Sequence, residues 1–371
     1  MDYGQQCAET GHCYNRLRPI GSSLWFSVPF RLGLSASVTL ITLHLLLAAI
    51  SIALSVMAMR NLFQISKKNI PYQTAIGLCL FVISAVAHGL FLCPTIQLPL
   101  TDTPANLFAL IAIWLMLIQV GHRRQFTLML LAGLCLGFAA WLRVAFLYPL
   151  LLMLLAWMTQ WLFSKQRNLS ELGLLSALLP IVIQFHATWE HTGAISYLDP
   201  NTTEKLMHEH RDNSAIGYDT VMGYPWKWYP ECAHYQPLVE AINSHDIYSL
   251  GCLLYGRVNF YLGSYSASTY IIFDANETAT SNARGRKDKI RRWSHVLLAA
   301  NGLVLIIATA LLGNKIIKQT AFPYSLVFVF LILVCGQAII SLPEQRFAIT
   351  PLIAAWVLGL SWMITKNANA R

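Results

Sequence analysis

The sequence predicts an all-α polytopic membrane protein with about nine transmembrane helices and one large extracytoplasmic loop region. Of its 371 residues, 56% are hydrophobic and only 12% are charged, whereas soluble domains carry about 25% charged residues. The mean hydropathy is +0.51. Apolar runs of roughly 20 residues, the length that crosses about 30 Å of hydrocarbon, recur along the chain. A polar block of residues 189–292 interrupts them.

Each apolar run is predicted to be a helix, because backbone groups in lipid must form their hydrogen bonds within the segment. The predicted spans are 38–58, 73–93, 104–121, 126–142, 144–163, 171–188, 294–313, 321–342 and 348–365. They divide the chain into an outer N-terminal loop (1–37), a first transmembrane bundle (38–188), an extracytoplasmic loop domain (189–292) and C-terminal transmembrane helices (293–371).

The orientation follows from the lysines and arginines, which concentrate in cytoplasmic loops. The gaps with this basic character are 59–72, 122–125, 164–170 and 314–320. The remaining gaps and the polar block are then outside, and the two sides alternate through all nine spans. The basic stretch 284–292 is an exception: either it meets anionic lipid or phosphate, or the topology differs there. Residues 1–37 fall outside without a preceding helix, so we expect an upstream membrane helix to be missing.

The N-terminal segment 18–31 is apolar but too short to span the membrane. It fits either an amphipathic helix lying along the interface or a plain lead-in to the first span. Cys7, Cys13, Cys232 and Cys252 lie in polar segments and could form disulfides in an oxidising compartment, with the pairing left open. No His/Cys pattern has metal-ligand spacing, so the sequence predicts no metal site.

A large aqueous segment on one side of the membrane favours an enzyme or a receptor over a simple pore. The net charge of +9 would also fit a nucleic-acid-binding protein. However, most basic residues lie in short gaps between apolar runs, which is the pattern of membrane anchoring. We therefore expect membrane lipids rather than nucleic acid as partners.

Several ionisable side chains fall on the predicted outer face. Asp102 precedes a span, where it could cap the helix with Thr101 and Pro104 or present a carboxylate at a fixed point. Arg143 sits between two apolar runs, where it could snorkel at a tight turn or serve a function. The other candidates are Asp2, Arg18, Arg257, Glu344 and Arg346. A carboxylate can act as a general base on a hydroxyl, and arginines can bind and stabilise phosphate.

Several segments, in order, resemble the GT-C superfamily of integral-membrane glycosyltransferases that use polyprenyl-phosphate sugars, such as protein mannosyltransferases and aminoarabinose transferases. Asp2-Tyr3 followed by Arg18-Pro19-Ile20-Gly21 resembles the first outer loop of that family. The other similar stretches are Leu100–Leu110, Gly133–Leu150 and Leu342–Leu352. The chain departs from the family by lacking paired acidic residues in the first loop and a C-terminal soluble domain.

The resemblance implies a sugar transferase at the outer face of the membrane, with a glycan or lipid as acceptor. Asp102 or Asp2 would be the catalytic carboxylate, and Arg143, Arg346 and Arg18 would bind the donor phosphate. Glu344 and Arg257 would support them. The resemblance implies no definite cofactor, and a divalent cation stays an open alternative. We expect the bacterial inner membrane, with the site on the periplasmic face. The alternatives are an O-antigen polymerase or ligase, which would use a diphosphate donor, and a transporter.

Overall fold

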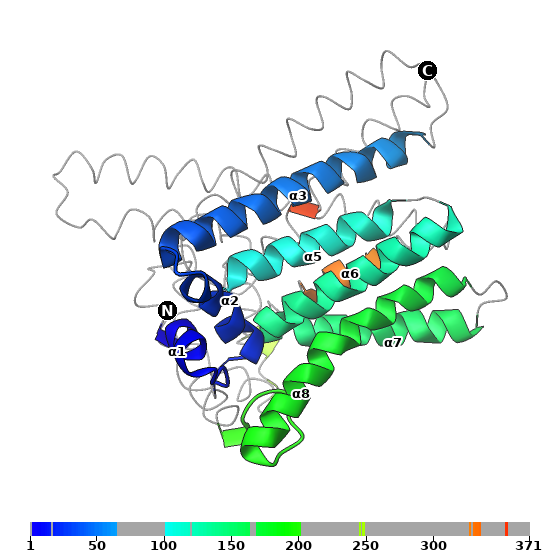
Figure 1. Ribbon diagram of the computed structural model, residues 1–371. Coiled ribbons are helices and arrows are strands. Elements are labelled where there is room, and N and C mark those ends of the chain that lie inside the picture. Colours follow the sequence, from blue (N-terminus) through cyan, green and yellow to red (C-terminus); the bar gives the residue numbers. More distant parts are fainter. Residues whose placement is uncertain are drawn as a thin grey trace.

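The computed structural model describes residues 2–15, 18–64, 101–118, 121–163 and 168–201, with short pieces at 245, 247–248, 326–327, 329–334 and 353–354. The named elements in this part are all helical (Figure 1). They are α1 (Asp2–Thr10), α2 (Ile20–Arg31), α3 (Ala36–Gln64), α5 (Asp102–Leu117), α6 (His122–Leu142), η1 (Val144–Phe146), α7 (Leu147–Phe163), η2 (Leu169–Ala177) and α8 (Leu178–Thr192).

Among the described residues, four helical segments are long and apolar enough to cross a membrane. They are Ala36–Met59, Arg124–Leu142, Val144–Phe163 and Leu169–Thr192, and they correspond to the predicted spans 38–58, 126–142, 144–163 and 171–188. The predicted spans 73–93 and 294–313 lie outside the described residues, as do most of 321–342 and 348–365. The polar block 189–292 also lies outside them, apart from its first residues and residues 245, 247 and 248.

Helix α5 is shorter than the predicted span 104–121, since it covers 16 residues. At 1.5 Å per residue it is about 24 Å long, less than the hydrocarbon thickness. All of its residues except Phe108 are buried. A helix that is apolar on every side belongs in a core, and α5 packs against both α3 and α6. Within the described residues, α5 is an internal helix between α3 and α6.

The packing of α6 depends on two glycines spaced four residues apart. A side chain at Gly137 would come within 2.5 Å of the Ala177 carbonyl oxygen, and one at Gly133 within 2.4 Å of the Ser176 hydroxyl. Small residues at this spacing let helix backbones approach closely in a membrane. The glycines therefore place α6 directly against η2 and the start of α8.

The segment η2 is a 3-10 helix of nine residues, although 3-10 runs longer than about four residues are uncommon. In a 3-10 helix, every third residue lies on the same face. Here the three small residues Ser170, Gly173 and Ser176 have this spacing. The Ser176 hydroxyl donates to the Leu130 carbonyl at 2.7 Å, and a side chain at Gly173 would meet the Leu130 backbone nitrogen at 2.6 Å. This stripe of small residues allows η2 to lie close to α6.

The N-terminal segment 18–31 forms a helix of its own, α2, which a turn at Gly33 (φ +64°) separates from α3. Its buried residues are mostly small: Gly21, Ser22, Ser23, Phe26, Ser27 and Pro29. It packs against α1, α6 and α3. The segment is thus not a continuous lead-in to the first span, and it uses its small face to contact protein.

The described helices run in both directions between two ends of the bundle: α3, α5 and α7 run one way, and α6 and η2–α8 run the other way (Figure 1). Figure 1 shows α1, α2 and the first turns of α3 and α5 gathered at one end, where α6 also finishes. The end of α7, the start of η2 and the start of α6, which carries the exposed Arg124, lie at the other end. This arrangement agrees with the predicted alternation of basic and non-basic gaps. We call the end that holds α1 and α2 the mouth of the bundle.

Candidate functional site at the mouth of the bundle

Asp102 and Arg143 form an ion pair at the mouth. The Arg143 Nη2 atom lies 2.5 Å from the Asp102 Oδ1 atom. The Asp102 side chain is 1% exposed and the Arg143 side chain is 19% exposed. The structure therefore brings together two of the residues that the sequence singled out separately, one as a carboxylate and one as a deep cation.

Asp102 is not the cap of α5, because Thr101 occupies the N-cap position and makes no side-chain capping hydrogen bond. Asp102 instead stands in the first helical turn, where the positive end of the helix dipole favours a carboxylate. Its carboxylate forms an ion pair with Arg143. Of the two roles that the sequence suggested for Asp102, a helix cap and a carboxylate at a fixed point, the structure shows Thr101 at the N-cap position and the Asp102 carboxylate beside Arg143.

Arg143 occupies the break between two helices. Its backbone is extended (φ −144°, ψ 122°), so α6 ends there, while its N–H still donates to the Ala139 carbonyl at 3.0 Å. The 3-10 turn η1 follows at once, with the Phe146 N–H donating to the Arg143 carbonyl at 3.1 Å. The side chain thus leaves the bundle at a fixed point between α6 and α7.

The end of α6 is braced by donors from distant parts of the chain. The last four carbonyl groups of a helix lack partners within it. The Ser22 hydroxyl donates to the Leu142 carbonyl at 3.0 Å, and the Tyr197 hydroxyl donates to the Ala140 carbonyl at 2.8 Å. These two bonds flank the ion pair and hold the backbone that carries Arg143.

Gln184 of α8 links the start of α2 to the segment that carries Tyr197. Its Oε1 accepts from the Ile20 N–H at 2.7 Å, and its Nε2 donates to the Tyr197 carbonyl at 2.9 Å. Burial raises the pKa of Tyr197, so its hydroxyl stays a donor at neutral pH. Sequence reasoning missed Ser22, Gln184 and Tyr197. Gln184 follows the apolar run at the start of α8, where a polar side chain is itself a signal.

The groups around Asp102 are polar and buried. Thr101, Thr103 and Asn106 are fully buried, and the Asn106 amide donates to the Asp102 backbone carbonyl at 2.8 Å. The carboxylate therefore stands in a polar neighbourhood rather than against hydrocarbon, which lowers the cost of keeping an ion pair there.

Sequence reasoning also missed His44, which is fully buried in α3. Its ring lies parallel to Trp25 at a centroid distance of 6.0 Å, and Trp25 in turn meets the edge of Phe108 at 6.1 Å. His44, Ser51 and Ser55 are buried on α3 at spacings of seven and four residues, which place them on one helix face. The sequence did contain a signal for this site, because these polar residues recur at helical spacing within an apolar run.

The other predicted site residues are not joined to the ion pair in the described part of the structure. Asp2 is the first residue of α1, which packs on α2. Arg18 precedes α2 with an exposed side chain and forms a backbone bridge with Asn15. Arg257, Glu344 and Arg346 lie outside the described residues. Within the described ranges, no group of three or more His, Cys, Asp or Glu residues could hold a metal ion.

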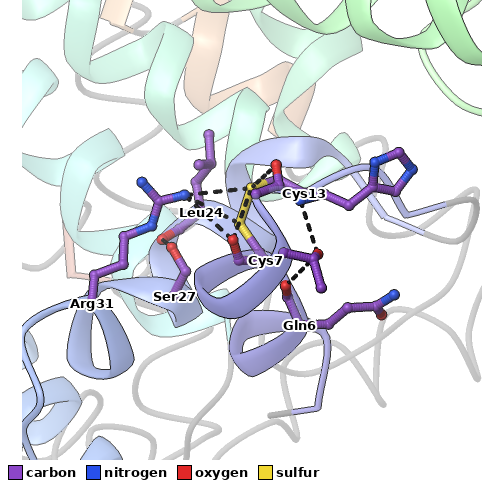
Figure 2. Close-up of a disulfide and its surroundings, with 9 residues drawn as sticks. Gln6, Cys7, Cys13, Leu24, Ser27 and Arg31 are labelled. Carbon is purple, nitrogen blue, oxygen red and sulfur yellow. Dashed lines mark hydrogen bonds between the residues drawn. A yellow bond between two sulfur atoms is a disulfide. The ribbon is translucent and has the colours of Figure 1, made fainter.

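A disulfide joins Cys7 and Cys13 at this same end of the bundle (Figure 2). The sequence left the pairing open among four cysteines, of which Cys232 and Cys252 lie outside the described residues. A disulfide persists in oxidising compartments and is rare in the cytosol. The disulfide lies at the mouth, at the opposite end of the bundle from the exposed Arg124.

Comparisons with known proteins identify no relative of this chain. No family model, no curated protein and no solved structure matches this chain. What is established is a helical protein whose four long apolar helices suit a membrane, with a buried Asp–Arg pair at one end of the described bundle.

Proposed function

We propose that the protein is a membrane glycosyltransferase that moves a sugar from a polyprenyl-phosphate donor to a glycan or lipid acceptor at the extracytoplasmic face. The observation that carries the proposal is the Asp102–Arg143 ion pair. It couples a carboxylate that can take a proton to a guanidinium that can bind phosphate, and it lies where a lipid-linked donor would present its head group.

The uneven exposure of the pair suits this chemistry. Arg143 reaches the surface while Asp102 is enclosed. A donor phosphate could therefore approach Arg143 first and form charge-assisted, bidentate hydrogen bonds with it. Drawing Arg143 toward phosphate would weaken its hold on Asp102, which would then be available to accept a proton.

Asp102 and Arg143 can account for the proton and the charge that move in the transfer step. The acceptor hydroxyl gives its proton to Asp102 while its oxygen forms a bond to the anomeric carbon of the sugar. The bond between that carbon and the phosphate oxygen breaks, and polyprenyl phosphate leaves with the electron pair. Arg143 stabilises the charge that develops on the leaving phosphate.

The decisive experiment supplies polyprenyl-phosphate sugars to the full chain in proteoliposomes and scores the release of polyprenyl phosphate. Asp102→Asn and Arg143→Ala are compared with Arg124→Ala, which removes an arginine from the other end of the same helix, α6. We expect release by the wild type and by Arg124→Ala, and a loss of at least about a hundredfold in the two site variants, the size of a general-base or phosphate-stabilising contribution.

A folding defect is separated from a chemical one by Arg143→Lys. This variant keeps a cation for Asp102 but loses the bidentate fork, so it should fold and still lose most of its activity. Release that depends on diphosphate donors alone would point to the polymerase or ligase alternative. No release from either donor by folded wild-type protein would overturn the proposal and leave the transporter alternative.

A further inference from the structure

The Cys7–Cys13 disulfide has a cationic neighbour that a purely structural crosslink does not need. Figure 2 shows Arg31, in the last turn of α2, reaching across to the disulfide between Cys7 of α1 and Cys13 of the segment that follows α1. Its Nη2 atom lies 3.8 Å from the sulfur of Cys7 and 3.8 Å from the sulfur of Cys13, and 3.5 Å from the Cys7 carbonyl oxygen. One guanidinium nitrogen thus faces both sulfurs.

A guanidinium gains little from a neutral disulfide, because the sulfur atoms are weak acceptors. It gains much more from a thiolate, which carries a full negative charge. A cation held beside both sulfurs therefore stabilises the reduced pair more than the oxidised pair. Stabilising the reduced form makes a disulfide easier to reduce.

We infer that Cys7 and Cys13 form a reversible redox site, with Arg31 stabilising its reduced form, and that the natural partner is a dithiol reductant or a disulfide oxidant. This inference does not depend on the proposed sugar transfer. The N-terminal pair of helices, α1 and α2, would then have a redox function in addition to its structural crosslink.

The burial of the two cysteines favours one order of events. The residue Cys7 is fully buried, whereas the residue Cys13 is 8% exposed. A reductant thiolate would attack the Cys13 sulfur and form a mixed disulfide, and Cys7 would leave as a thiolate facing Arg31. The second thiol of the reductant then attacks its own sulfur in the mixed disulfide and releases Cys13. Two electrons pass to the cysteine pair, and the reductant becomes a disulfide.

Reduction would also release a segment that touches the mouth. Cys13 anchors the stretch that carries His12 and Tyr14, and Tyr14 stacks on His191 of α8 at 4.2 Å. His12 meets the edge of the same ring at 5.2 Å. The disulfide therefore fixes a segment that leads from α1 past the end of α8 to α2.

The test is a redox titration of the full chain in detergent, equilibrated with mixtures of reduced and oxidised dithiothreitol. The reduced fraction is read by alkylation and mass spectrometry of the peptide that contains Cys7 and Cys13, so the other cysteines do not interfere. The variants are Arg31→Ala and Arg31→Lys, with Arg18→Ala as the matched control at the other end of α2.

We expect Arg31→Ala to make the pair about fivefold harder to reduce, which is about 20 mV. The effect is modest because Arg31 is an exposed residue and water screens it. Arg31→Lys should keep part of the effect, and Arg18→Ala should match the wild type. An unchanged or easier reduction of folded Arg31→Ala would overturn the inference.

A second measurement needs no variant and covers the case in which Arg31→Ala fails to fold. Raising the salt concentration screens the attraction between Arg31 and the thiolates, so the wild-type pair should become harder to reduce in high salt. A reduction equilibrium that does not respond to salt, together with a slow thiol alkylation rate at neutral pH in the reduced protein, would show an inert structural crosslink.

Discussion

Arg143 and Asp102 meet at the mouth of the bundle, with a nitrogen–oxygen distance of 2.5 Å, although one ends α6 and the other begins α5. The pair ties the buried start of α5 to the end of α6, where Arg143 is partly exposed. Because Asp102 is enclosed and Arg143 is partly exposed, the two partners should respond differently to substitution.

Arg143→Ala should destabilise the protein by about 3–5 kcal/mol, because it leaves the Asp102 carboxylate buried without a countercharge. Asp102→Asn should cost less, since the Arg143 side chain that it leaves behind can turn toward water. The double variant Asp102→Asn/Arg143→Gln should be more stable than Arg143→Ala. Unfolding by sodium dodecyl sulfate titration in mixed micelles measures all three, and equal losses from the two single variants would contradict this account.

Gly137→Ala should destabilise the packing of α6 on α8 by about 1–3 kcal/mol, because overpacking of a close interface has this cost. The added methyl group would meet the Ala177 carbonyl at 2.5 Å. Gly121→Ala is the control, since a side chain there has nothing within 4 Å. The same titration compares the two variants, and equal stability would mean that α6 and α8 do not pack this closely.

Tyr197→Phe should lower stability by about 0.5–1.5 kcal/mol at neutral pH, because it removes the hydrogen bond to the Ala140 carbonyl. Burial raises the pKa of Tyr197, so the folded state resists losing this proton. The stabilisation is therefore complete below the ordinary tyrosine pKa of about 10 and is lost as the pH rises above it. The difference in the free energy of unfolding between wild type and Tyr197→Phe should shrink above that pH. A difference that does not change with pH would argue against a buried hydroxyl.

The two ends of the bundle should be accessible from opposite sides of the membrane. Ser35 lies at the mouth before α3, and Gly121 precedes α6 at the other end, and both are exposed. A membrane-impermeant maleimide should label Ser35→Cys in intact cells and Gly121→Cys only after the membrane is opened. The unsubstituted protein gives the background from its own cysteines, and labelling of both positions from one side would overturn the predicted topology.

The α8 terminus should depend on the left-handed conformation of Gly193, which has φ +70° and closes the helix with a hydrogen bond from its N–H to the Trp189 carbonyl. Gly193→Ala should cost about 1 kcal/mol, whereas Gly193→Asn should cost less because asparagine tolerates this conformation. Thermal unfolding of the two variants in detergent tests the order, and an alanine variant as stable as the asparagine variant would contradict it.

The sequence by itself determined where the described long helices run. The apolar stretches at 38–58, 126–142, 144–163 and 171–188 are each helical, because the length and apolarity of a span are local properties that the bilayer demands of it. The alternation of basic and non-basic gaps across the membrane stays a prediction from the sequence. The sequence likewise marked Asp102 and Arg143 as unusual, because charge beside an apolar run is rare.

Only the tertiary structure decided which residues meet. It paired Asp102 with Arg143, joined Cys7 to Cys13, and placed Ser22 and Tyr197 on the last carbonyls of α6. It also turned the expected span 104–121 into a short, internal helix and residues Leu169–Ala177 into a 3-10 helix. Apart from the Cys7–Cys13 disulfide, whose partners are six residues apart, these outcomes depend on contacts between segments far apart in the chain. The energy of such contacts is not encoded in the composition or periodicity of either segment alone.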